Sequence, residues 1–96
     1  MSPKEQLILR FLIDNPKGLY GSDFVSISQG KLPRGSIYTM LDRLVDKGYV
    51  REVVDEPVSQ TALARTRHVI TSRGMREYRG FLADHGLLIQ AGAFSK

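Results

Sequence analysis

Residues 32–50, LPRGSIYTMLDRLVDKGYV, are the stretch from which the fold can be inferred. Pro33 suits the first turn of a helix, because its missing N–H would be unpaired there in any case. Gly48 suits a left-handed residue just beyond a helix end, so a helix is predicted over about residues 33–47. Apolar side chains recur at helical spacing, and one face should therefore be buried. These side chains are Ile37, Met40, Leu41, Leu44 and Val45.

The opposite face of this predicted helix is small and polar near its start. It carries Gly35, Ser36, Thr39, Asp42 and Arg43, with Tyr38 on the flank. Small residues let the N-terminal end of a helix approach another surface closely, which a DNA-recognition helix has to do. The stretch therefore predicts the recognition helix of a winged-helix domain.

Two further helices are predicted before this segment. The first covers about residues 3–15 and has Ser2 as its N-cap. Its apolar arc is wider than one stripe, which indicates either a central core helix or packing against a second subunit. The second covers about residues 22–29 and begins at Ser22 and Asp23. Its inward side chains are predicted to be Phe24, Val25 and Ile27. Helices joined by so few residues must cross steeply, as in a helix-turn-helix.

A β-hairpin and a last helix are predicted after Gly48. Residues 49–54 and 66–70 are rich in β-branched side chains and should pair as antiparallel strands. Thr71 should cap a helix over about residues 72–85. The apolar side of that helix is Met75, Tyr78, Phe81 and Leu82.

The predicted fold class is α+β and mostly α, a winged helix-turn-helix with three helices, a two-stranded wing and a C-terminal helix. Residues 1–71 would form the DNA-binding domain, and residues 72–96 the C-terminal helix and tail, a dimerisation element. Residues 17–21 are interpreted as a connector and residues 55–64 as a loop.

The composition limits the classes of function that the chain can have. The 96 residues carry 14 Lys and Arg against 10 Asp and Glu, a net charge of +4, which suits a polyanionic partner. The absence of cysteine excludes disulfides and fits a reducing cytoplasm. No apolar run is long enough for a membrane span. Neither His68 nor His85 has neighbours at metal-ligand spacing, and no catalytic motif is present. The chain is therefore expected to be a cytoplasmic protein without enzyme activity, metal or cofactor.

Three motifs resemble a known family. Residues 35–38 (GSIY), 41–44 (LDRL) and 47–50 (KGYV) are similar to the recognition-helix signature of PadR-like transcriptional regulators. Residues 65–74 are similar to that family's second wing strand and the start of its next helix. The resemblance covers about residues 3–82 and implies a short-form, dimeric, DNA-binding member.

The sequence departs from this family in its wing. Asp55, Glu56 and Pro57 stand where a short basic turn is commoner, and His68 stands where an aromatic residue is usual. The chain has no tryptophan, which excludes a tryptophan-lined ligand pocket, and no small-molecule effector is indicated.

The candidate DNA-binding residues lie on the predicted recognition helix and the second wing strand. They are Arg34, Ser36, Tyr38, Thr39, Arg43, Arg65 and Arg67. Short hydroxyls can donate to phosphate oxygens, and an arginine can fork onto guanine O6 and N7. Arg65 and Arg67 should point to the same side of their strand. Both sets could instead be ordinary solvated surface, and Tyr38 could instead border the core.

Two hypotheses follow. The first is a homodimeric repressor that binds a pseudo-palindromic operator with its recognition helices about one helical turn apart. Its dimer contacts are expected at Met75, Tyr78, Leu82, Leu87 and Leu88. The second is a winged-helix protein-interaction module without a specific DNA target, which the acidic wing loop and the modest net charge favour.

Overall fold

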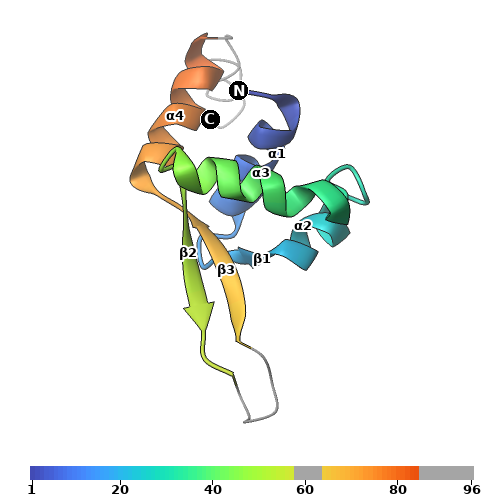
Figure 1. Cartoon of the computed structure of the whole chain (residues 1–96). Helices are drawn as coiled ribbons and strands as arrows, with labels where there is room; N and C mark the ends of the chain where they lie inside the picture. The colour runs from blue at the N-terminus through green and yellow to red at the C-terminus, as the bar shows by residue number, and fades with distance from the viewer. Residues whose placement is uncertain (58–63, 85–96) are drawn as a thin grey trace.

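The computed structural model describes residues 1–57 and 64–84 (Figure 1). Within these ranges the elements are α1 (Pro3–Asp14), β1 (Leu19–Tyr20), α2 (Gly21–Ile27), α3 (Arg34–Asp46), β2 (Val50–Asp55), β3 (Arg65–Ile70) and α4 (Ser72–Asp84). The helices pack beside a small sheet whose strands β2 and β3 extend away from them (Figure 1). This order confirms the predicted α+β winged helix-turn-helix. None of the helices described is long and apolar enough to cross a bilayer.

Helix α3 begins and ends within one residue of its predicted bounds. Pro33 has an extended backbone, with φ −71° and ψ 151°, so it is the N-cap rather than the first helical residue. Gly48 has φ 81°, which a residue with a side chain rarely adopts. This conformation lets the Gly48 N–H donate to the Val45 carbonyl at 2.9 Å and the Tyr49 N–H donate to the Leu44 carbonyl at 3.0 Å. The glycine therefore ends α3 as predicted.

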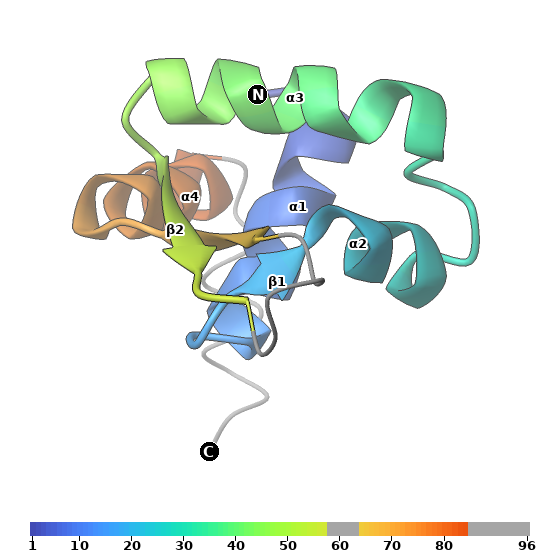
Figure 2. The ribbon, with the colours of Figure 1, turned by 60° about the horizontal axis from the view of Figure 1, so that its bottom comes forward.

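One hydrophobic core joins the helices to the sheet. Its members are Ile8, Leu9, Leu12, Leu19, Phe24, Leu32, Ile37, Leu41, Leu44, Val50, Ile70 and Tyr78. Figure 2 shows α1 beneath α3, with α2 on one side and α4 on the other. The additional apolar residues of α1, Leu7, Phe11 and Ile13, are partly buried against the same core. The width of the α1 arc is thus explained by a central position in this chain.

The sheet has the strand order β1-β3-β2, and all its pairs are antiparallel. Strands β2 and β3 form the predicted hairpin, in register from Val50 opposite Ile70 to Asp55 opposite Arg65. Strand β1 was not predicted, because the segment at residues 17–21 was interpreted as a connector. It pairs only Leu19 with His68 and Tyr20 with Arg67. Two residues are too few to display the alternation that predicts a strand.

The start of α2 differs from its prediction. Ser22 is not the N-cap, since Tyr20 occupies that position and the Asp23 carboxylate accepts from the Tyr20 N–H at 2.8 Å. An acidic residue at the third helical position reaches back in this way in a capping box. Ile27, which was predicted to face inward, is 45% exposed because it lies at the last turn of a short helix. The predicted caps Ser2 and Thr71 are confirmed.

Leu41→Ala tests the orientation of α3. Leu41 is 0% exposed, so losing its side chain should lower the free energy of unfolding by about 2–5 kcal/mol, measured in urea. Thr39→Ala, on the exposed side of the same helix, is the control and should change that value by less than about 0.5 kcal/mol. Equal effects of the two substitutions would contradict the observed burial.

Candidate nucleic-acid interface

The outer face of α3 is polar and open to solvent near its start. Arg34, Gly35, Thr39 and Arg43 are exposed, and Ser36 is half-buried. A Cβ placed on Gly35 would have no atom within 4 Å, so this end of the helix has free space around it. The structure thus brings Ser36, Thr39 and Arg43 together on one accessible face of α3, while Arg34 is exposed at the first turn on another side of the helix.

Tyr38 connects this face of α3 to α2. Its side chain is 53% exposed, yet its ring lies directly on Gly21, the first residue of α2. A Cβ at Gly21 would come within 2.5 Å of Tyr38 Cε1 and 2.6 Å of the hydroxyl oxygen, closer than real contacts allow. Gly21 therefore leaves the space that the Tyr38 ring occupies beside α2. The sequence did not single out Gly21, because nothing local shows which side chain packs on it.

A cavity of about 350 Å³ lies between α3 and the wing. Asp42 of α3, Glu52 of β2, and Arg65 and His68 of β3 contribute to its lining. Asp42 and Glu52 are exposed, so two carboxylates lie between α3 and the wing, with the exposed Arg65 in the same lining. The opposite side of α3 has a basic excess, because Arg43, Lys47 and Lys4 line a groove of about 410 Å³ between α3 and the start of α1 in which Glu5 is the one acid.

His68 is buried in the wall of the cavity beside the wing. The residue is 5% exposed, and its Nδ1 has no hydrogen-bond partner within the described part of the chain. Burial lowers the pKa of His68 below its ordinary value, and the carboxylates of Glu52 and Asp42 oppose this shift. The neutral imidazole is therefore the form that the folded protein favours.

The arginines of β3 are engaged with other side chains of this chain. Arg67 Nε donates to both carboxylate oxygens of Asp55, at 3.0 Å and 2.9 Å, and its Nη1 donates to the Lys17 carbonyl. Arg65 lies over the Tyr20 ring, 3.7 Å from its centre. The Tyr20 hydroxyl donates to Asp55. Arg65 and Arg67 thus share one side of the strand, as predicted, but Arg67 is committed to internal partners.

Asp55 has a different environment from the one predicted. The sequence suggested that it lies in an acidic loop, but it is the last residue of β2 and accepts hydrogen bonds from Tyr20 and Arg67. These donors lower the pKa of the Asp55 carboxyl, and the same hydrogen bond raises the pKa of the Tyr20 hydroxyl. The charge of Asp55 is therefore offset within the protein.

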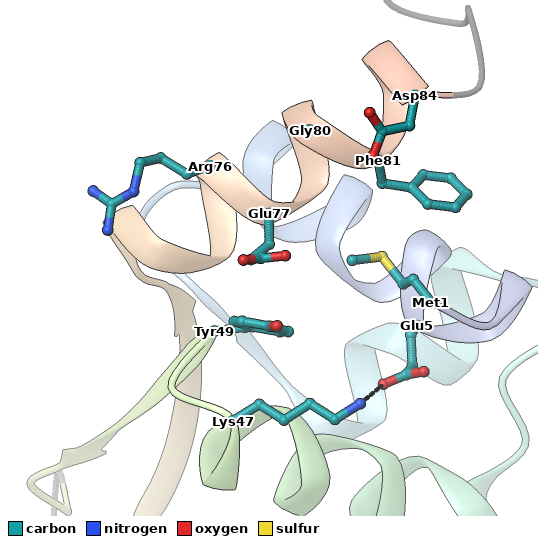
Figure 3. A pocket seen from close by; sticks show the side chains of 9 residues that line it. All are labelled: Met1, Glu5, Lys47, Tyr49, Arg76, Glu77, Gly80, Phe81 and Asp84. Atoms are coloured by element: carbon teal, nitrogen blue, oxygen red, sulfur yellow. Dashed lines mark hydrogen bonds and ion pairs between the residues drawn. The ribbon is translucent and has the colours of Figure 1, made fainter.

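A further hollow, of about 360 Å³, lies between α4, the start of α1 and the beginning of β2 (Figure 3). At its edge the Lys47 ammonium lies 3.0 Å from the Glu5 carboxylate, which ties the end of α3 to α1. Glu77 and Tyr49 face each other across it (Figure 3). Among the described residues no group of three His, Cys, Asp or Glu could hold a metal ion. The Lys47–Glu5 ion pair in this hollow therefore links the end of α3 to α1.

The residues predicted to form a dimer fall into three groups. Tyr78 is 7% exposed and belongs to the core of this chain, so it presents little surface to a partner. Met75 and Leu82 are only partly buried, against the same core. Leu87 and Leu88 lie outside the described residues.

Neither a protein-family model nor a curated protein sequence matches the chain. Solved structures share its fold, among them the following two. Bacillus subtilis PadR in complex with operator DNA matches 84% of this chain with a TM-score of 0.69 and 23% sequence identity. This match spans 48% of PadR, so the chain corresponds to about half of that protein. A Thermoplasma acidophilum protein, provisionally described as a transcriptional regulator, matches 93% of this chain, with a TM-score of 0.64, 24% identity and 82% coverage of its own chain. These matches confirm the PadR-like resemblance for the fold.

His68 predicts a pH dependence of stability. Because the folded state lowers its pKa, the unfolded chain takes up the proton first as the pH falls through about 6.5. The free energy of unfolding should therefore be highest above that pH and fall on acidification toward the lower folded-state pKa. Urea unfolding at several pH values between 7.5 and 5.5 measures this loss.

His68→Phe is the matched variant, since it keeps a ring on the strand and removes the titrating group. It should lose less stability than the original protein over the same pH interval, whatever its stability at pH 7.5. Identical pH profiles for the two proteins would show that His68 is not the group responsible.

Proposed function

We propose that the protein is a sequence-specific DNA-binding transcriptional regulator, a homodimeric repressor that places α3 in the major groove of a pseudo-palindromic operator. The observation that carries this proposal is the exposed, small and polar start of α3, a helix whose other end leads into a projecting β-hairpin (Figure 1). A structure with the same fold, PadR, contains operator DNA. A helix with this shape can insert its N-terminal half into a groove about 12 Å wide.

Several exposed side chains of α3 have a suitable partner on DNA. Thr39 and Ser36 can donate to phosphate oxygens, and the Thr39 methyl group can contact thymine. Arg43 forms no salt bridge among the described residues, and it can donate two hydrogen bonds to a guanine. The Tyr38 hydroxyl, which lies close to Gly21, would contact a phosphate next to the groove. Arg34 and Arg65 supply further positive charge at the two ends of this surface.

Dimer formation is part of the proposal, with Met75 and Leu82 of α4 and the tail residues Leu87 and Leu88 as its contacts. A two-fold dimer would place two copies of α3 about one helical turn apart on the duplex. We also propose a cytoplasmic role without catalysis or a cofactor. A protein-interaction module remains the second candidate, because Asp42 and Glu52 give the surface between α3 and the wing a negative charge.

Selection from a randomised duplex pool tests the proposal. At about 0.15 M salt, where weak electrostatic binding is suppressed, we expect enrichment of an inverted repeat with half-sites about 10 bp apart. An enriched single half-site would support recognition and contradict the dimer. Binding that is weak, unselective and lost as salt rises would contradict the DNA function and favour a protein partner.

Arg43→Ala tests base recognition by α3. We expect it to weaken binding to the selected site by about 1–3 kcal/mol and to relax preference at one base pair, because a guanine contact is lost. Binding to selected and random duplexes measures the change. Arg10→Ala, which removes an exposed arginine from α1, is the control and should leave both affinities unchanged. An equal loss on both duplexes would instead make Arg43 a phosphate contact.

A further inference from the structure

Four side chains meet where the wing joins β1, and we call this cluster the wing latch. Its members are Tyr20, Asp55, Arg65 and Arg67. Asp55, at the end of β2, accepts from the Tyr20 hydroxyl of β1 and from Arg67 Nε of β3. Arg67 also reaches the Lys17 carbonyl in the segment between α1 and β1. The latch therefore joins all three strands to the loop that follows α1.

The backbone contact between the wing and β1 is short. Strand β1 pairs with β3 through only two residues, whereas β2 pairs with β3 through six. A two-residue ladder gives little resistance to a change in the angle of the hairpin, so side-chain bonds across the junction carry more of that task. The Arg67 and Asp55 side chains are 30% and 28% exposed, which shields their ion pair partly from water.

The latch is connected to the recognition helix by direct contacts. Tyr20 precedes Gly21, and the Tyr38 ring of α3 rests on Gly21. The backbone N–H of Tyr20 also donates to Asp23, which fixes the start of α2. A change in the position of Tyr20 would therefore move the support on which Tyr38 lies.

We propose that Asp55 and Arg67 are positioning residues, which hold the wing at the angle to α3 that DNA binding requires, and that Arg67 does not itself contact DNA. This inference rests on the proposed DNA-binding function. For a substitution of Asp55, it predicts a change in DNA affinity opposite to the change expected for an unpaired acid near DNA. Removing an unpaired acid would strengthen binding to a polyanion, whereas removing a latch residue weakens it.

A double-mutant cycle with Asp55→Asn and Arg67→Gln tests the latch. Each single variant should lower affinity for the selected operator about five- to tenfold, and the double variant should bind no more weakly than the weaker single variant. The dependence of affinity on salt should keep its slope, because no phosphate contact is lost. Arg10→Gln and Asp14→Asn, which break an exposed pair 3.7 Å long on α1, are the matched controls and should leave affinity unchanged.

Tyr20 supplies a readout that does not depend on DNA. Its hydrogen bond to Asp55 raises the pKa of the hydroxyl, so Asp55→Asn should bring that pKa back toward its ordinary value in a tyrosine NMR titration. Tyr20→Phe removes only the hydroxyl and should weaken operator binding with less effect on the melting temperature than Arg67→Gln has. This milder variant keeps the test informative where the ion-pair variants unfold.

Several outcomes would overturn the inference. Tighter binding by Asp55→Asn would show that Asp55 only repels DNA. A salt slope reduced by about one in Arg67→Gln would make Arg67 a phosphate contact. Additive losses in the double variant would show that the two residues act separately. Failure of the original protein to select any site would instead refute the DNA-binding function on which the inference rests, and an altered Tyr20 titration would still establish the contact itself.

Discussion

The division of α3 into a buried face and an exposed face is the constraint on which the rest of the structure depends. Ile37, Leu41 and Leu44 are completely buried, and their burial fixes the rotation of the helix about its own axis. A helix turns 100° per residue, so this rotation also decides that Gly35 and Thr39 point outward. The same rotation of α3 therefore determines both which side chains enter the core and which are exposed on the outer face. A substitution that changed the packing of the buried side chains would also change the orientation of the exposed ones.

The elements that the sequence predicted well are those long enough to display a period. Helix α3 shows its apolar stripe over several turns and carries end signals at Pro33 and Gly48, so its bounds could be predicted closely. Strand β1 has two residues, and its partner β3 lies far along the chain, so its pairing depends on the tertiary fold. The start of α2 was misplaced for a related reason. Ser22 and Asp23 both suit a helix start, and only the packed structure shows that Asp23 caps from the third position.

The candidate site also contains residues that local periodicity predicts and residues whose contacts depend on the tertiary fold. The outward residues of α3 follow from helical geometry alone. The roles of Asp55 and Arg67 do not, because the partners of Asp55 are 35 and 12 positions away in the chain. Seen only in the sequence, Asp55 is an acid that argues against DNA contact and Arg67 is a cation that argues for it. Because the two side chains pair with each other, the sign of either charge alone does not predict its effect on DNA binding. The hydrogen-bond partners of each residue must also be known.

The charges that remain on either side of α3 favour an asymmetric contact with DNA. If α3 occupies a major groove, as proposed, one phosphate backbone passes each flank of the helix. Lys4, Arg43 and Lys47 line the flank nearer α1, although Lys47 is paired with Glu5. The flank nearer the wing carries Asp42 and Glu52, which repel phosphates, against one cation, Arg65. The helix should therefore lie closer to the backbone on the α1 side. On the wing side, the greater distance from the phosphates would weaken their repulsion by Asp42 and Glu52.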